Sequence, residues 1–591
     1  MNRFIKFQSF GFSLFLLVSS VYIVPSSQFR SLNQPDKQPL EEGQILYSPM
    51  WSTYTYLVDR DGYINNSWNS SYWPGVAVWW VGEGTILRTI RLSGAPGGGG
   101  GVQLVSRNGT VIWDFRYDTD GNLTHHDVKS LPNGDVLLIA WEHKTREEAI
   151  SAGRNPDLVS NWGLSMDHII EVKPTSPTSG QIVWEWHAWD HLIQDYDSSK
   201  ENYGVVRDHP ELININYWET DQGDMMHTNS IDYNPKLDQI LISVCYYNEI
   251  WVIDHSTTTK EAAGHTGGTS GKGGDILYRW GNPLAYERGT SSDQRLFLQH
   301  DATWIKPNFP GAGDILVFNN EVNRHSYVDE ITPPVNDTGD YYLEENSCYG
   351  PVETTWNYTA PGFYAGQYGG AIRLASGNTL ITNGESGLVF EVNSKKETVW
   401  QYNTGVTLFK VVYVPLESPR EPNVACSGSL SWDHIKPGAT AKGSLQVQNI
   451  GVTGSLLNWT VDTSSVSWGN WSCTPKSGEN LTPAEGPLTV EVSVVAPNES
   501  KSKFEGYLLV KNVNNPFDFE WIPVLLRTSQ NTEMNGFRTL LDQLHPSLSL
   551  KPKILSHFIG RNSIIAKFTP TKPSENIKYD MIKEDAFLNI T

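Results

Sequence analysis

Apolar and polar residues alternate along most of this chain in short runs bounded by Gly, Pro, Asn and Asp, a pattern typical of β-strands joined by turns. One unit recurs about six times: an apolar strand, a turn, and a second strand that closes on two aromatic rings one residue apart. Side chains two residues apart on a strand point to the same face, so both rings of a pair share one face. The pairs are Trp113/Phe115, Trp184/Trp186, Tyr278/Trp280, Trp356/Tyr358 and Trp400/Tyr402, with a looser first copy in residues 57–68.

This repeat predicts the fold of the larger part of the chain. A small sheet cannot cover both of its own faces, and about six copies in a row become stable when they close radially. We therefore predict an all-β protein whose residues 40–417 form a six-bladed β-propeller. A pair of β-sandwiches with chance aromatic matches is the alternative.

The pattern changes after a linker at residues 417–422. Residues 422–530 alternate between apolar and polar positions with turn signals every ten or so residues, which predicts an immunoglobulin-like (Ig-like) β-sandwich of roughly seven strands. Cys426 and Cys473 could bridge its two sheets in an oxidising compartment. Residues 531–591 are expected to be a tail, partly helical or disordered.

The first residues have the pattern of a targeting signal. Arg3 and Lys6 precede an apolar run at residues 10–24, so residues 1–26 are predicted to be a signal peptide or a membrane anchor. Eleven N-x-S/T motifs are a dense set for a cytosolic protein. We therefore expect an extracytoplasmic glycoprotein, secreted or tethered at the cell surface. The motifs begin at Asn65, Asn69, Asn108, Asn122, Asn336, Asn357, Asn458, Asn470, Asn480, Asn498 and Asn589.

Composition excludes several classes of protein. The 591 residues hold 44 basic and 65 acidic side chains, and a net charge of -21 argues against a nucleic-acid partner. The four cysteines show no CxxC spacing, so neither a zinc ribbon nor a thioredoxin-like site is predicted. We expect no cofactor and no resident metal.

A second repeated pattern carries the candidate chemistry. Four segments share a polar or small start, a few apolar residues, a turn and an apolar strand, and three of them open with His. Equivalent positions of propeller blades face the same central channel, so His126, His227 and His300 should converge on the axis. The segments are HHDVKSLPNGDVLLI, HTNSIDYNPKLDQILIS, HDATWIKPNFPGAGDILVF and GGAIRLASGNTLIT.

Three imidazoles in a channel could form a structural polar plug, a metal site, or a nucleophile with acid/base partners for phosphoryl or sulfuryl transfer. Asp127 and Asp301 directly follow histidines, so they should point to the opposite face and cap turns. Arg324 is the best placed cation for an anionic group, and Asn229 could line the pocket or bond the backbone.

Several segments resemble, in their order and spacing, the arylsulfotransferase family of aryl-sulfate sulfotransferases that work without the nucleotide donor PAPS. The resemblance covers roughly residues 45–405 and implies a six-bladed propeller. It also implies ping-pong transfer of a sulfuryl group from a phenolic sulfate ester to a phenol through a sulfohistidine. By this resemblance His300 is the nucleophile, while His227 and His126 bind sulfuryl oxygens or move the phenol proton. The segments are HHDVKSLPNGDVLL, MHTNSIDYNPKLDQILIS, NEIWVIDHS, QHDATW, GDILVFNN and GNTLIT…GLVFEV.

One position departs from the family pattern. Where family members place an Arg against the sulfate, in the strand after H-x-N-S, this chain has Cys245. A thiol replaces a guanidinium poorly, so Arg324, Arg295 or another donor would have to meet the charge of the transferred group. Cys245, Arg324 and Asn229 complete the predicted substrate-binding set. The alternative function is a catalytically inactive binding propeller at the cell surface.

Overall fold

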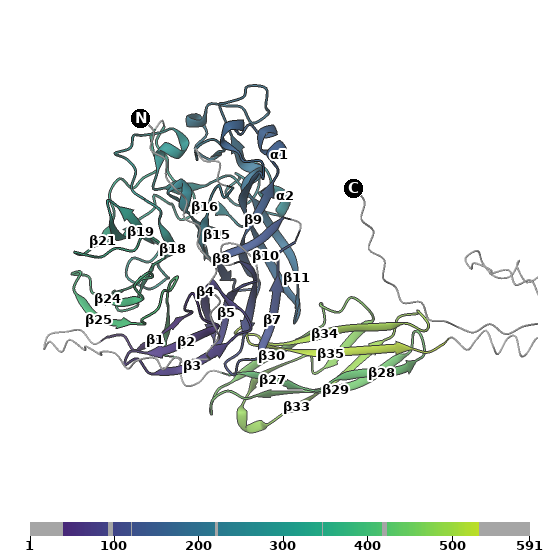
Figure 1. Cartoon of the computed structure of the whole chain (residues 1–591). Coiled ribbons are helices and arrows are strands. Elements are labelled where there is room, and N and C mark those ends of the chain that lie inside the picture. The colour runs from purple at the N-terminus through teal and green to yellow at the C-terminus, as the bar shows by residue number, and fades with distance from the viewer. Residues whose placement is uncertain are drawn as a thin grey trace, which may run out of the picture. The chain divides into compact units, whose positions relative to one another are not determined.

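The computed structural model describes residues 40–92, 99–119, 121–218, 223–345, 347–416 and 422–530 (Figure 1). The predicted targeting segment at residues 1–26 and the tail at residues 531–591 lie outside this described part. Helix is sparse within it: α1 (Arg146–Ser151) and α2 (Thr259–Ala262) are short. No helix among the described residues has the length and hydrophobicity needed to cross a membrane.

Antiparallel sheets of four strands make up residues 43–415, and the described chain forms six of them. The predicted all-β propeller is confirmed. From the innermost strand outward, sheet 1 is β26 (Val412–Pro415), β1 (Gly43–Tyr47), β2 (Tyr54–Asp59) and β3 (Ile64–Asn69). Sheet 2 is β4 (Trp73–Gly82), β5 (Thr85–Arg91), β6 (Gly100–Val105) and β7 (Val111–Arg116). Sheet 3 is β8 (Asn122–Ser130), β9 (Val136–Lys144), β10 (Leu164–Ser176) and β11 (Ser179–His187).

The remaining sheets repeat this order. Sheet 4 is β14 (Thr228–Asn234), β15 (Gln239–Val244), β16 (Glu249–Asp254) and β17 (Tyr278–Trp280). Sheet 5 is β18 (His300–Trp304), β19 (Ile315–Val322), β20 (His325–Ile331) and β21 (Trp356–Tyr358). Sheet 6 is β22 (Gly370–Arg373), β23 (Thr379–Asn383), β24 (Leu388–Val392) and β25 (Thr398–Asn403). A small parallel pair, β12 (Leu192–Ile193) with β13 (Ile213–Asn214), lies in the insertion between sheets 3 and 4.

The period-two alternation explains why these sheets close into a ring. Successive apolar residues of a strand point to opposite faces and enter different hydrophobic clusters. Leu57 packs against sheet 2, while its neighbour Val58 packs against sheet 6. Val317 packs against sheet 4, while Leu316 packs against sheet 6. Each sheet thus shares one apolar cluster with the sheet before it and another with the sheet after it.

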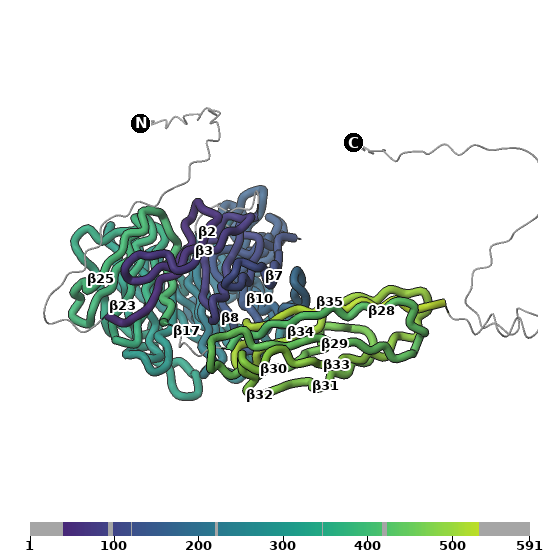
Figure 2. The backbone as a smooth tube through the Cα atoms, turned by 90° about the horizontal axis from the view of Figure 1, so that it is seen from below, coloured from purple at the N-terminus to yellow at the C-terminus, as the bar shows by residue number. Residues whose placement is uncertain are grey.

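Sheet 1 combines the two ends of the propeller sequence. Its innermost strand, β26, comes from residues 412–415 and pairs antiparallel with β1 from residues 43–47. Figure 2 shows the purple first strands beside the green strands of sheet 6. The two ends of the propeller sequence therefore close the ring, and Phe409 and Lys410 lie just before the strand that closes it.

The aromatic repeat joins neighbouring sheets. The paired rings lie on the outermost strand of their sheets, as in β7, where Trp113 and Phe115 stack with centroids 5.4 Å apart. In most sheets the indole N–H of such a tryptophan also donates to a backbone carbonyl of the next sheet or its connecting loop, at 2.7–2.9 Å. A large apolar ring with one donor suits this position, because the ring fills the interface while the N–H satisfies a carbonyl there. The bonds are Trp68 to Ser106, Trp113 to Ser179, Trp186 to Gly274, Trp280 to Pro351 and Trp400 to Arg60.

Residues 424–528 form a β-sandwich of nine strands, two more than the seven predicted. Its two sheets enclose a core that includes Trp459. The Ig-like assignment within this architecture stays a prediction. One sheet is β27 (Val424–Ser427), β29 (Thr440–Asn449), β33 (Leu488–Val495) and β31 (Asn470–Thr474). The other is β28 (Leu430–Ile435), β35 (Phe519–Thr528), β34 (Lys503–Asn512), β30 (Leu457–Asp462) and β32 (Ser477–Leu481).

The expected bridge between the sandwich sheets is wrong. Cys426 on β27 and Cys473 on β31 occupy opposite edges of the same sheet, with β29 and β33 between them. Three strand spacings separate them by roughly 14 Å. A disulfide needs Cα atoms within about 7 Å, and both thiols are free.

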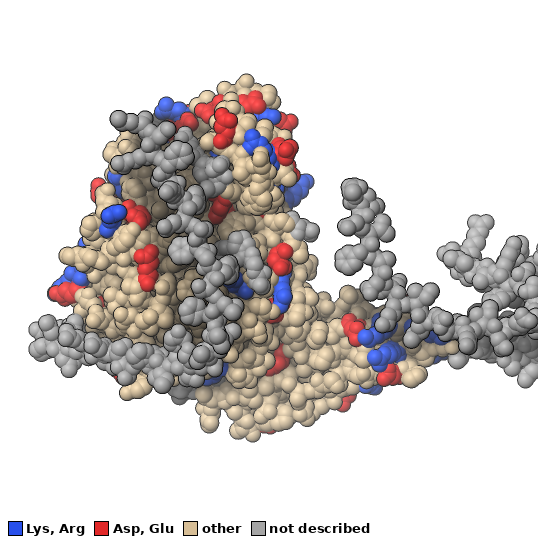
Figure 3. All heavy atoms as spheres, viewed as in Figure 1, with Lys and Arg blue, Asp and Glu red and all other residues tan. Residues whose placement is uncertain are grey.

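The surface carries mixed charge. On the face shown in Figure 3, the described basic side chains are interspersed with acidic ones and are not gathered into a basic patch. This distribution agrees with the net charge of -21. It gives the view no stripe of positive potential of the kind that binds a phosphate backbone.

Candidate functional site

The structure brings His126, His227 and His300 together: His126 and His300 lie on the inner strands β8 and β18, and His227 directly precedes the inner strand β14. The rings of His126 and His227 have centroids 4.7 Å apart. Phe409 precedes the closing strand β26. The centroid of its ring lies 6.0 Å from the ring centroid of His126 and 6.0 Å from that of His300. Residues separated by 101 and 73 positions in sequence thus form one cluster, in which His126 and His300 are buried and the side chain of His227 is 27% exposed.

Each of the three inner strands is irregular at its histidine. The pairing register shifts between Thr124 and Val128 on β8, between Thr228 and Ser230 on β14, and at the start of β18 after His300. His126 and His227 have φ angles of 54° and 52°, in the left-handed region that residues with a Cβ rarely adopt. β-Bulges turn side chains away from the regular alternation, and strained backbone of this kind gathers at functional sites.

His300 is held in one tautomer by Asn320 on the neighbouring strand β19. The Asn320 Nδ2 donates to the carbonyls of Ala365 and Tyr368, so its Oδ1 faces the His300 ring. His300 Nδ1 lies 2.9 Å from that Oδ1 and 3.1 Å from the carbonyl of Leu298. Both partners only accept hydrogen bonds, so Nδ1 carries the proton and the lone pair resides on Nε2. Burial lowers the pKa of His300 to about 4, which keeps the ring neutral.

His227 has the opposite electrostatic environment. Its Nδ1 lies 2.5 Å from Asp224 Oδ2, and its backbone N–H donates to Asp224 Oδ1 at 3.0 Å. Burial alone would lower the pKa of His227, but the hydrogen bond and charge of Asp224 raise it above its ordinary value. The cluster therefore combines a neutral imidazole at His300 with one at His227 that holds its proton more tightly. Environments that push two pKa values apart are typical of an acid/base pair.

His126 belongs to a relay that leads away from the axis. Its Nδ1 lies 2.8 Å from His125 Nδ1, and His125 Nε2 lies 3.2 Å from Asp167 Oδ1. Burial lowers the pKa of His126 well below its ordinary value, and the nearby His227 lowers it further. When the Nε2–H of His125 donates to Asp167, the Nδ1 of His125 accepts a hydrogen bond from the Nδ1–H of His126. The lone pair of His126 then resides on its Nε2.

Lys410 lies beside these histidines and is buried between two carboxylates. Its Nζ is 2.7 Å from Asp127 Oδ2 and 2.7 Å from Asp301 Oδ1. Burial would lower the pKa of Lys410, but the two charges raise it overall, so the ammonium stays protonated. The expectation that these aspartates cap turns is wrong. They do point away from their histidines, as strand alternation requires, but they meet a cation supplied by the segment just before the closing strand β26.

The fourth repeated segment has Gly369 and Gly370 where the segment of sheet 5 has His300 and Asp301, and the packing shows why the second of these positions is Gly. A Cβ on Gly370 would lie 2.1 Å from Asp301 Oδ2. The carboxylate needs this approach, because its Oδ2 also accepts the N–H of Ala371 at 3.3 Å. A side chain at position 370 would therefore push Asp301 away from Lys410.

The predicted substrate-binding residues occupy different surroundings. Asn229 is buried, and its Nδ2 donates to the carbonyl of Gln299 at 2.7 Å, so it supports the residue before His300. Cys245 is buried, and burial raises its pKa far above the usual range of a thiol. Arg324 is exposed in the turn between β19 and β20, near the ring of Tyr364. Arg295 is engaged with the backbone carbonyls of Val352 and Ser292.

Aromatic rings line one side of the cluster. Tyr246 stacks on His227 with centroids 4.8 Å apart, and Trp218 stacks on Tyr246 at 5.0 Å. Trp218 and Tyr217 also line an open hollow of about 630 Å³ that contains Asp195 but none of the three histidines. The stack thus connects His227 of the cluster with a surface recess large enough for a phenolic ring.

Sequence reasoning missed four groups of this site: Asp224, Asn320, Phe409 and Lys410. Phe409 and Lys410 were discoverable, since the closing strand must supply the sixth inner position of the ring. The chain is too irregular around Asp224 for a repeat to mark it. Asn320 is one of three consecutive polar residues near the end of β19, and the sequence gives no direction for their side chains.

The inner strands of the six four-stranded sheets thus surround a cluster of three imidazoles, two of them buried, beside a lysine bound by two aspartates. This is a β-propeller with a histidine-centred site. The chain belongs to the arylsulfotransferase (ASST) family, whose family model matches residues 52–413.

No curated protein matches the sequence, and the following solved structures are distantly similar to it. A Bacteroides caccae protein of unknown function is 13% identical with a TM-score of 0.35, over 63% of this chain and 99% of that one. The Cps50 (Swd1) β-propeller domain of Myceliophteria thermophila is 8% identical with a TM-score of 0.31, over 78% and 99%. A PapD-like domain of human CEP192 is 18% identical with a TM-score of 0.15, over 20% and 91%.

Proposed function

We propose that this protein is an aryl-sulfate sulfotransferase that moves a sulfuryl group from a phenolic sulfate ester to a phenolic acceptor through a sulfohistidine on His300. The observation that carries the proposal is the pair of opposed imidazoles. His300 is neutral with its lone pair on Nε2, and His227 holds a proton through Asp224. Family membership supports the same class of substrate.

In the first half-reaction, Nε2 of His300 attacks the sulfur of the donor. The bond between sulfur and the phenolic oxygen breaks, and its electron pair leaves with that oxygen. Protonated His227 gives the leaving oxygen a proton, so the products are a phenol and His300 carrying the sulfuryl group on Nε2. The Asn320 Oδ1 accepts the hydrogen bond from the Nδ1–H of His300 throughout, and this favours the positive charge that develops on the ring.

The second half-reaction reverses these roles. The acceptor phenol loses its proton to neutral His227, and its oxygen attacks the sulfur as the bond to Nε2 breaks. This restores both imidazoles to their starting states. His227 in its protonated form also supplies the positive charge that the family pattern places on an arginine at the position of Cys245. We further propose that the reaction takes place outside the cytoplasm, on the basis of the apolar N-terminal run and the eleven glycosylation motifs.

A donor–acceptor assay tests this function. We expect purified protein to release 4-nitrophenol from 4-nitrophenyl sulfate steadily only when phenol is present, with phenyl sulfate as the second product. Parallel lines in double-reciprocal plots would show the ping-pong order. Folded protein that turns over none of a panel of phenolic sulfates would instead support the inactive binding propeller, which the buried Cys245 favours.

The pH profile of kcat/KM should reflect both imidazoles. Activity should rise with pH as His300 loses its proton near pH 4, and should fall again above the raised pKa of His227, where its proton is lost. In Asp224→Asn the alkaline limb should move to lower pH, because burial is then unopposed. The acidic limb should stay in place.

This variant also has an internal control in the choice of donor. Loss of proton donation should slow phenyl sulfate by about 100-fold near pH 8, and 4-nitrophenyl sulfate much less, because its leaving group needs little protonation. Equal losses with both donors would contradict a role of His227 as the proton donor.

A further inference from the structure

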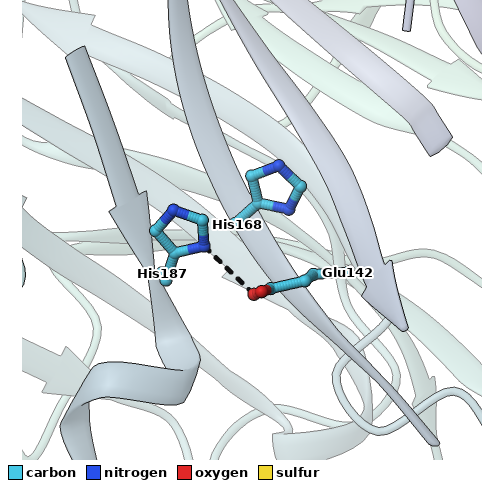
Figure 4. Close-up of side chains that lie close together, drawn as sticks. All are labelled: Glu142, His168 and His187. Atoms are coloured by element: carbon cyan, nitrogen blue, oxygen red, sulfur yellow. Dashed lines mark hydrogen bonds and ion pairs between the residues drawn. The ribbon is translucent and has the colours of Figure 1, made fainter. Parts of the chain in front are cut away.

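Sheet 3 holds a second group of potential ligands away from the three histidines of the axis. Glu142 on β9, His168 on β10 and His187 on β11 each offer one ligating atom, and these atoms all lie within 4.8 Å of one another. The two rings lie parallel with centroids 5.0 Å apart, and Figure 4 shows a nitrogen of each ring on the side of the Glu142 carboxylate.

Strand register explains this convergence. His168 pairs directly with His187 across β10 and β11. Glu142 pairs with Met166, two residues from His168 on the same face of the sheet. Backbone pairing of three adjacent strands therefore holds the three side chains in place, which is the pre-organisation that a binding site needs.

One ring nitrogen of His168 has no partner among the described residues. Its side chain is 0% exposed, and its Nδ1 has no hydrogen-bond partner in the described part of the chain. Its Nε2 lies 3.3 Å from the hydroxyl oxygen of Tyr117. A buried nitrogen with a free lone pair is unfavourable and uncommon, so this atom points to a ligand from solution.

The surroundings match those of metal-bound histidines, whose second ring nitrogen is usually held by another group. Glu185 Oε2 lies 3.3 Å from His187 Nε2, while His187 Nδ1 lies 3.0 Å from Glu142 Oε2. Tyr117 plays the corresponding part for His168. Lys144 binds the other oxygen of Glu142, Oε1, and leaves Oε2 directed at the rings.

We propose that Glu142, His168 and His187 bind one divalent transition-metal ion, with Zn²⁺ the ion that two imidazoles and one carboxylate suit best. The ion takes the place of the proton between His187 Nδ1 and Glu142 Oε2, and that proton leaves to solvent. Three protein ligands leave a coordination position for water. Because His187 and Glu142 are partly exposed, at 27% and 18%, an ion can enter from solution.

The bound ion would crosslink β9, β10 and β11. On β10 the residue next to His168 is Asp167, which points to the opposite face and holds His125 of the axial relay. The ion would thus stiffen the strand that supports one side of the histidine cluster. The proposal concerns a site outside the transfer chemistry, and it can fail while the proposed function stands.

Zinc binding to the untagged full-length protein tests the proposal. After treatment with EDTA and dialysis, the protein is titrated with ZnCl₂ alone against a chromophoric chelator, and retained zinc is measured by mass spectrometry of the metal after desalting. The wild type should retain one zinc per chain and melt at a higher temperature with zinc. His187→Ala and Glu142→Gln should weaken binding at least 100-fold, and Glu185→Gln about tenfold.

His265→Ala provides the matched control. His265 lies in the other group of close ligands, with His191 and Asp275, but both nitrogens of His191 there already have partners, Asp275 and the carbonyl of Ala262, each at 2.8 Å. This variant should keep its zinc. The proposal is overturned if the wild type retains no zinc, or if zinc remains in His187→Ala and Glu142→Gln. Loss of zinc in His265→Ala alone would overturn it as well. Circular dichroism shows that each variant is folded.

Discussion

Replacing His300 by Ala should reduce sulfuryl transfer at least about 10⁴-fold, since no other group can then take up the sulfuryl group on the path described above. The loss should fall on kcat for both half-reactions. The cause is local: the His300 ring contacts Asn320 and Leu298 but carries no charge, so its removal leaves no buried ion behind. The measurement is steady-state transfer from 4-nitrophenyl sulfate to phenol.

His325→Ala is the matched control for this change. His325 is exposed at the start of β20, so its loss should leave transfer within about twofold of the wild type. A His300→Ala protein that is folded and retains a tenth or more of the activity would exclude His300 as the nucleophile.

Lys410→Met should cause a larger loss of stability than the other substitutions described here, about 3–5 kcal/mol in the free energy of unfolding of the propeller. This is the typical cost of removing one partner of a buried ion pair, because the remaining charge is left without compensation. Here the remaining charges are two, Asp127 and Asp301, whose side chains are 0% and 2% exposed. Urea unfolding followed by tryptophan fluorescence measures the change.

Two further variants separate charge from packing in this effect. The triple variant Lys410→Met, Asp127→Asn, Asp301→Asn removes all three charges and should recover at least half of the loss, since neutral amides are less costly to bury. Lys395→Met, at an exposed position, should change stability by no more than about 0.5 kcal/mol. A Lys410→Met protein within 1 kcal/mol of the wild type, by the same measure, would contradict the assigned role.

The repeated features of this molecule were those that sequence could predict. The aromatic pairs and the three histidine-led segments recur in a constant register, and in a propeller a constant register becomes a common position in space. This is why residues as distant as His126 and His300 were expected to meet. The aromatic rings were predicted to share a face, and the structure adds that their indoles bind the neighbouring sheet.

Features that occur once were not predictable in this way. Asp224 reaches His227 from an irregular segment, and Asn320 is directed by two carbonyls that only the fold brings near. Lys410 was missed because the innermost strand of the first sheet comes from the end of the propeller sequence. The bridge between Cys426 and Cys473 was wrong because strand order, which decides their separation, is not encoded in their spacing.

The intact mass of the protein after mixing with an aryl sulfate in the absence of acceptor tests the central claim most directly. We predict one added sulfuryl group per chain, located on the peptide that contains His300, lost when phenol is added, and absent from His300→Ala. Release of phenol from the donor by folded protein with no adduct, or an adduct that persists in His300→Ala, would contradict it.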